Sequence, residues 1–144
     1  MRRFVLTPVS LFIDDELCHE RAVVVCDSSI ERICSYCDIA AEVNAGLEIV
    51  DGQGLLLAAG FIDTQVNGGG GVMINDVPTL QGIDAIRRGH WSGGTTAMLP
   101  TLITDRYDVM QQAVHATAQA MATLPGIIGI HLEGPHLNVQ RKGV

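Results

Sequence analysis

The chain has 144 residues, with 16 Asp and Glu against 9 Lys and Arg and a formal net charge of −7 at pH 7. This length is typical of about one domain, and it is too short for a complete (β/α)8 barrel, which needs about 250 residues. The acidic balance argues against a nucleic-acid partner, because phosphate binding requires a basic surface that releases counterions. Any barrel signature in this sequence therefore predicts a part of a longer fold.

Two segments are apolar enough to be compared with targeting or membrane segments. The first, residues 4–13, is interrupted by Thr7, Pro8 and Ser10 and is followed by three acidic residues, which is not typical of a signal peptide. The second, residues 109–132, lacks Asp, Glu, Lys and Arg but carries several polar residues and Pro125. We therefore expect a cytoplasmic protein with no membrane partner.

The first 57 residues contain short apolar runs separated by turn residues, a spacing that predicts a β-meander. The expected strands are residues 4–6, 10–13, 21–26 and 30–35, with residues 47–50 pairing back onto the same sheet. A polar segment, residues 38–46, joins the last two of these strands. The pattern indicates a small sheet or part of a β-sandwich.

All four cysteines lie in this N-terminal part, whereas every glycine lies at position 46 or later. Cys34 and Cys37 have the spacing of half a zinc or redox site, but no second cysteine pair accompanies them. We interpret them as reduced thiols on or beside strands. Unchanged metal content after oxidation would support this interpretation, and loss of a stoichiometric metal on replacing both would contradict it.

From Leu55 onward the sequence alternates between strand and helix patterns. Residues 55–62 are almost continuously apolar, as in a strand buried on both faces of a parallel sheet, and further strands are expected over residues 95–99 and 127–133. One helix is expected over residues 79–92, with Gly82 and Gly89 each costing about 1 kcal/mol relative to Ala. Another is expected to begin at a Thr104 cap and to end before Pro125. Three such steps predict right-handed crossovers and a parallel sheet.

Polar side chains follow each of these strands, where α/β proteins place their sites. The candidates are Asp63, Gln65, Asn67, Thr101, His131, Glu133 and His136. Because side chains alternate along a strand, residues 63, 65 and 67 are expected to share a face, as are residues 131 and 133. Carboxylate, amide and imidazole groups converging on one edge can bind a divalent metal that activates water.

Three blocks of this region, in the same order and spacing, resemble the N-acetylglucosamine-6-phosphate deacetylases of the amidohydrolase superfamily. The blocks are AGFIDTQVNG at residues 59–68, GTT with LPTLIT at residues 94–104, and GIHLEGPHLN at residues 129–138. The HLEGP segment carries the strongest signal. The resemblance extends over residues 3–144.

The resemblance implies an α/β fold: part of a composite β-sandwich over residues 1–57, then the first three βα steps of a metal-dependent (β/α)8 barrel over residues 58–144. It implies that Glu133 binds one divalent metal ion, Zn²⁺ being expected. Gln65 and Asn67 stand where many amidohydrolases have two metal-binding histidines, so Gln65 is expected near the metal and a second metal is not. Val144, His136 and Asn67 are the candidate substrate contacts.

The implied reaction is hydrolysis of the acetamide of N-acetylglucosamine 6-phosphate, with the general-base aspartate and two further metal-binding histidines beyond residue 144. The isolated chain is then expected to be inactive, and the full-length protein to be a homo-oligomer, a dimer or tetramer. No catalytic residue is assigned within the chain itself.

Other interpretations stay open at this point. The chain is alternatively a non-catalytic fragment whose open sheet edge, after residues 127–133, pairs with another copy or another protein. A third interpretation is an amidohydrolase of different substrate. For individual residues, Gln65 and Asn67 can serve only to bond loop backbone, and His131 is expected to pack rather than to bind metal. His19, His90 and His115 have no expected partner, and the glycines at 68–71 are expected to form a tight loop and not a P-loop, because no Lys-Ser/Thr follows.

Overall fold

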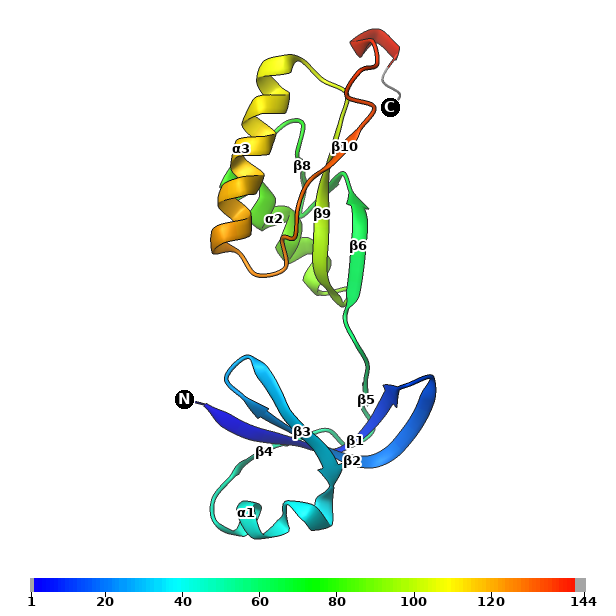
Figure 1. Ribbon diagram of the computed structural model, residues 1–144, viewed down its shortest axis with the longest axis vertical. Helices are drawn as coiled ribbons and strands as arrows, with labels where there is room; N and C mark the ends of the chain where they lie inside the picture. Colours follow the sequence, from blue (N-terminus) through cyan, green and yellow to red (C-terminus); the bar gives the residue numbers. More distant parts are fainter. Residues whose placement is uncertain (1, 142–144) are drawn as a thin grey trace. The chain divides into compact units, whose positions relative to one another are not determined.

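The computed structural model describes residues 2–141 (Figure 1). The chain divides between Ala59 and Gly60 into two compact units, which we call unit 1 and unit 2. No helix in the described part of the chain combines the length and apolar character needed to cross a membrane.

Unit 1 is built on one mixed sheet. Its strands β1 (Arg3–Ile13), β2 (Glu16–Cys26) and β3 (Ser29–Ser35) form an antiparallel meander, as the sequence predicts. On its other side β1 pairs in parallel with β4 (Glu48–Asp51) and with the two-residue strand β5 (Leu56–Leu57). Alternating side chains of β1 and β2 fill two small apolar clusters, which contain Val5, Val9, Leu11, Ala22, Val23, Val24 and Ile39.

Two local expectations for unit 1 are wrong. β1 continues through Thr7-Pro8 as one strand, and the irregular register between Leu6 and Val9 accommodates the proline, which cannot donate to the ladder. The segment expected to be a polar connection contains a 3-10 turn η1 (Tyr36–Asp38) and a helix α1 (Ala40–Asn44). Ile39 between them is fully buried, so one apolar side chain anchors the segment onto the sheet.

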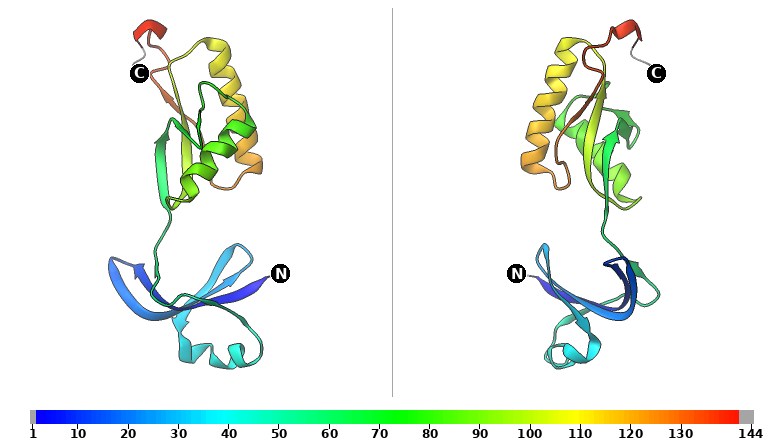
Figure 2. Two further views of the ribbon diagram at one scale, coloured as in Figure 1. Left: turned by 180° about the vertical axis from the view of Figure 1, so that it is seen from behind. Right: turned by 45° about the vertical axis from the view of Figure 1, so that its right-hand side comes forward.

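Unit 2 is an α/β unit with a parallel sheet in the order β10-β9-β6 (Figure 1). β6 (Phe61–Val66) leads through a short hairpin, β7 (Gly68–Gly69) and β8 (Val72–Met73), to helix α2 (Leu80–Trp91). β9 (Thr95–Ile103) is followed by helix α3 (Tyr107–Thr123) and then β10 (His131–Glu133), and Figure 2 shows the same elements from other sides. The predicted parallel sheet and both helices are confirmed.

The strand boundaries in unit 2 differ from the sequence prediction. The apolar run over residues 55–62 is not one strand: β5 belongs to unit 1 and β6 to unit 2, so Asp63 and Gln65 lie within a strand rather than after it. β9 does not stop at Pro100 but continues to Ile103, and Pro100 lies next to an irregular register with β6. β10 is restricted to three residues, because residues 127–130 make only an isolated bridge from Ile127 to Met98.

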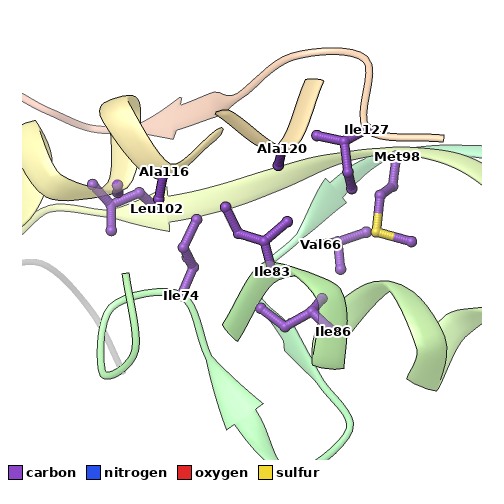
Figure 3. Close-up of a cluster of buried hydrophobic side chains, with 10 residues drawn as sticks. Val66, Ile74, Ile83, Ile86, Met98, Leu102, Ala116, Ala120 and Ile127 are labelled. Carbon is purple, nitrogen blue, oxygen red and sulfur yellow. The ribbon is translucent and has the colours of Figure 1, made fainter. Parts of the chain in front are cut away.

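The core of unit 2 lies between the sheet and its two helices (Figure 3). Val66, Met98 and Leu102 face it from the strands. The helices contribute Ile83 and Ile86 from α2 and Ala113, Ala116 and Ala120 from α3, and Ile74 and Ile127 complete the cluster. The small residues of α3 let this helix lie close to the sheet. This packing fixes the strands whose carboxyl ends carry the candidate site residues.

The glycines at 68–71 form the hairpin β7–β8, which packs directly against α2. A Cβ on Gly89 would lie 2.5 Å from Gly70 N, and a Cβ on Gly70 would lie 2.4 Å from Ala85 O. His90, for which the sequence suggested no partner, lies with Nε2 2.9 Å from Gly68 O. Gly89 in α2 is therefore required because the hairpin backbone lies too close for a Cβ, and intrinsic helix propensity does not take this tertiary contact into account.

A buried arginine on α2 leads to a first prediction. The Arg87 side chain is 5% exposed, donates from Nε and Nη2 to Asp84, and stacks on Trp91 with Cζ 3.8 Å from the ring centroid. Asp84→Asn is expected to lower the free energy of unfolding by about 2 kcal/mol, because it removes the counter-charge of a buried cation. Chemical denaturation of the chain measures this, and Asp108→Asn, which breaks an exposed pair, is expected to change stability by less than about 0.5 kcal/mol.

The same pair fixes the pH dependence of this effect. Hydrogen bonds from Arg87 hold the pKa of Asp84 below its usual value, with a smaller contribution from Arg88. The stabilisation is therefore fully present above the ordinary aspartate pKa and is lost as the pH falls through the lower pKa of the folded state. Equal losses in Asp84→Asn and Asp108→Asn at neutral pH would contradict this account.

Candidate functional site

The candidate site lies at the carboxyl ends of the three parallel strands of unit 2. Gln65 is near the end of β6, Thr101 is near the end of β9, and Glu133 ends β10. The register pairs His131 with Thr101 and Glu133 with Ile103, so residues distant in sequence meet at one edge of the sheet. The candidate side chains thus lie at the carboxyl ends of the strands, although Asp63 and Gln65 lie within β6 and not after it as the sequence predicts.

The contact that joins the first and last of these strands is a hydrogen bond between Gln65 and Glu133. Gln65 Nε2 donates to Glu133 Oε2 over 3.0 Å, and both residues are exposed. Asp63 accepts a hydrogen bond from the backbone N–H of Gln65 at 3.0 Å, which stabilises the strand end locally. The two side chains that the sequence assigns to a metal site are thus brought together across 68 residues of sequence.

Two buried threonines of β9 and its continuation contact β10. Thr101 Oγ1 lies 3.3 Å from His131 Nδ1 and 3.2 Å from Leu99 O. Thr104 Oγ1 lies 3.4 Å from Glu133 O and donates to Gly134 O. Thr104 is therefore not the helix cap that the sequence suggested: α3 begins after Arg106, and the hydroxyl bonds to the turn that follows β10 instead.

The candidate substrate residues occupy different positions. Asn67, directly after β6, places Nδ2 3.5 Å from Thr101 O, so its amide faces backbone in this structure. His136 lies on the exposed segment after β10. Val144 lies outside the described residues. The structure therefore places Asn67 at the site edge and leaves the roles of His136 and Val144 as predictions.

One residue that the sequence did not single out also organises this edge. Asn75, in the loop after β8, donates to Ile103 O at 3.1 Å and to Asp105 Oδ2 at 2.8 Å, and its Oδ1 accepts from Ile103 N at 3.3 Å. Its side-chain amide thus pairs with the end of β9 as a neighbouring strand would. Nothing in the sequence marks Asn75, because its partners, the backbone of Ile103 and the side chain of Asp105, lie 28 and 30 residues away.

The donor set fits part of a metal site. Glu133 offers carboxylate oxygens, which bind Zn²⁺ and other divalent ions, and Gln65 offers an amide oxygen, a carbonyl-type donor that suits harder ions such as Mg²⁺ or Mn²⁺. Zn²⁺ takes four ligands, and residues 2–141 contain no group of three His, Cys, Asp or Glu side chains placed to hold an ion. Among the described residues, a Zn²⁺ site built on Glu133 would thus have one carboxylate and its hydrogen-bond partner Gln65, and it would need further ligands from elsewhere.

The four cysteines are free and lie in unit 1. Cys18 and Cys26 are on β2, Cys34 is near the end of β3, and Cys37 is exposed in η1. They are far in sequence from the edge that carries Glu133. Their interpretation as reduced thiols without a metal stays a prediction.

Comparison with known proteins points to one group of enzymes. No family model matches the chain. It is 31% identical over 143 residues to the N-acetylglucosamine-6-phosphate deacetylase of Haemophilus influenzae, covering 99% of the chain and 36% of that protein. It is 60% identical over 88 residues to the N-acetylgalactosamine-6-phosphate deacetylase of a Shewanella species, covering 60% of the chain and 22% of that protein.

Among solved structures, the N-acetylglucosamine-6-phosphate deacetylase of Pasteurella multocida matches 99% of the chain with a TM-score of 0.86 and 32% identity. The chain spans 37% of that structure, about a third of the length of the relatives that it matches from end to end. The resemblance read from the sequence motifs is thus confirmed: over almost its whole length, this chain is similar to the N-terminal part of N-acetylglucosamine-6-phosphate deacetylases.

Proposed function

We propose that this chain supplies the first part of a metal-dependent deacetylase that hydrolyses the acetamide of an N-acetylhexosamine 6-phosphate. The observation that carries the proposal is the contact of Gln65 with Glu133 at the carboxyl edge of the parallel sheet. In this proposal Glu133 is a metal ligand, and the site is completed by residues beyond residue 144. The isolated chain then lacks the general base and is inactive.

The fold of the whole protein forms part of the same proposal. The three parallel strands of unit 2 are the first three βα steps of a (β/α)8 barrel, and unit 1 is part of a composite sandwich, with the domain boundary near residue 58. Supporting this, Phe61, Ile62 and Leu132 are exposed on the strands, at 69%, 65% and 38% respectively. Strands of a closed parallel barrel are buried on both faces, so a continuing barrel would cover these apolar side chains.

The proposed mechanism assigns a separate task to each residue of this chain. A divalent ion, when bound, polarises the acetamide carbonyl and lowers the pKa of water. Glu133 would bind the ion through a carboxylate oxygen, and Gln65 orients that carboxylate by donating its amide N–H to Oε2. Asn67, His136 and Val144 are proposed to contact the sugar. For the full-length protein we propose a cytoplasmic homo-oligomer whose substrate is a small molecule, an amino-sugar phosphate.

A second substrate is favoured by one finding. The Shewanella relative, at 60% identity, is named for N-acetylgalactosamine 6-phosphate, whereas the Haemophilus relative, at 31%, is named for N-acetylglucosamine 6-phosphate. The two sugars differ only in the orientation of the hydroxyl at C4, far from the acetamide bond that is cleaved. The galactosamine compound is therefore the second candidate substrate for the same chemistry.

Acetate release from both sugar phosphates tests this proposal. The proteins to compare are the 144-residue chain with Zn²⁺ and a chimera in which residues 1–144 replace the matching part of the Haemophilus influenzae deacetylase, the native Haemophilus enzyme serving as positive control. We expect no release by the chain alone and release by the chimera. Hydrolysis by the chain alone would contradict its incompleteness, and a folded, metal-loaded chimera that cleaves neither sugar would contradict the proposed function.

A further inference from the structure

We propose that Thr101 and Thr104 are positioning residues that hold the two ends of β10 in place, so that the Glu133 carboxylate meets Gln65. The importance of this placement for catalysis rests on the function proposed above, whereas the placement itself does not. Neither threonine would touch the substrate or the metal in this assignment. Both act through β10.

β10 needs such support because it is short and lies at one end of the described sheet. It pairs with β9 through three residues, His131, Leu132 and Glu133, and Glu133 is exposed. A strand of this length has few ladder hydrogen bonds, and its other edge is unpaired within residues 2–141. The ladder alone therefore leaves the direction of the last side chain weakly fixed.

The two threonines supply contacts that the ladder does not. Thr101 is 0% and Thr104 2% exposed, and buried hydroxyls in folded proteins are hydrogen-bonded. Thr101 reaches the side chain of His131, and Thr104 reaches the carbonyls of Glu133 and Gly134. One hydroxyl thus holds the start of β10 and the other holds its end, on either side of the Glu133 side chain.

The two partners of the Thr101 hydroxyl indicate which group donates in its hydrogen bond with His131. A hydroxyl has one proton, and Thr101 Oγ1 is within reach of both Leu99 O and His131 Nδ1. When the proton is given to the Leu99 carbonyl, which can only accept, Oγ1 accepts from an Nδ1–H of the ring. The threonine therefore fixes the orientation of the His131 ring as well as its position.

Nuclear magnetic resonance of the 144-residue chain tests the placement without any metal. Thr101→Val and Thr104→Val remove the hydroxyls at nearly constant shape, and Thr104→Ser keeps a hydroxyl. The matched control is Thr117→Val, because Thr117 is equally buried but bonds to Ala113 O within α3. The reporters are the Gln65 side-chain amide protons, the Gly134 carbonyl carbon and the His131 ring nitrogens.

In Thr104→Val we expect the resonances of the Gly134 carbonyl and of the Gln65 amide to shift toward the values of groups that are not hydrogen-bonded. In Thr101→Val we expect the resonances of the His131 ring nitrogens to shift. Thr104→Ser and Thr117→Val are expected to keep the wild-type values. If valine at position 104 prevents folding, Thr104→Ala removes the same hydroxyl with a smaller side chain. Unchanged Gln65 and Gly134 resonances in a folded variant would overturn the proposal, as would equal shifts in Thr117→Val.

The consequence for the proposed function is measured separately in the chimera by titration with Zn²⁺. Thr104→Val is expected to weaken Zn²⁺ binding about tenfold, the usual effect of removing a group that orients a ligand. If Glu133→Gln leaves Zn²⁺ affinity unchanged, the metal role of Glu133 fails while the resonance shifts still decide the positioning role. If Glu133→Gln weakens binding and Thr104→Val does not, only the positioning role fails.

Discussion

Replacing Glu133 by Gln in the chimera is expected to lower kcat/KM for the preferred sugar phosphate about 1,000-fold. The reason is that the Glu133 carboxylate, which meets Gln65 at the sheet edge, is the metal ligand proposed above. Metal ions supply several kcal/mol of transition-state stabilisation, and each 1.36 kcal/mol corresponds to a factor of ten in rate. Acetate release at saturating Zn²⁺, with matched protein concentrations, measures the effect.

The control for this substitution is Glu16→Gln, which removes an exposed carboxylate from β2 in unit 1. It is expected to leave kcat/KM within a factor of two of the unsubstituted chimera, since it lies outside the candidate site. A Glu133→Gln protein that is folded and keeps more than a tenth of the activity would show that the metal is held by other residues.

Replacing Gly89 by Ala is expected to destabilise unit 2 by about 3 kcal/mol, because overpacking of this kind costs about 1–3 kcal/mol or more when backbone must move. Helix propensity predicts the opposite, since Ala in a helix interior is about 1 kcal/mol better than Gly. The new Cβ would lie 2.5 Å from Gly70 N, so the hairpin β7–β8 and α2 would have to separate. The sign of the change therefore distinguishes a packing role from a simple propensity cost.

The matched control is Gly93→Ala, just after α2. A Cβ at Gly93 would meet only His90 O at 3.4 Å, an ordinary contact. We expect its effect on the free energy of unfolding to be less than about 1 kcal/mol. Thermal or chemical unfolding monitored by circular dichroism compares the two variants, and a Gly89→Ala protein as stable as the wild type would contradict the packing account.

The sequence predicts both helices of unit 2 because their apolar residues recur at helical spacing and because glycine or proline marks where each helix ends. The helix expected over residues 79–92 is α2, which ends before Gly93 as expected, and Thr79, expected as its first residue, caps it by accepting from Gly82 N. The run over residues 55–62 is misinterpreted because continuous apolar residues indicate burial but not which sheet buries them. Here Leu57 pairs with β1 and Phe61 with β9.

Part of the candidate site can also be predicted from the sequence. The sequence predicts Gln65 and Glu133 as site residues because parallel α/β sheets place their functional sites at the carboxyl ends of the strands. Thr104 precedes an acidic residue, a pattern that predicts a helix cap, whereas its hydroxyl contacts the carbonyls of Glu133 and Gly134 at the end of β10. Such partners depend on tertiary register, which local sequence patterns do not encode.

The most direct test of the central claim, that this chain contributes one ligand to a metal site completed elsewhere, is the metal content of the purified proteins. After incubation with Zn²⁺ and removal of free metal, the account predicts one bound ion per chimera, far less than one in its Glu133→Gln variant, and far less than one in the 144-residue chain. A full complement of zinc in the isolated chain, or in the Glu133→Gln chimera, would contradict it.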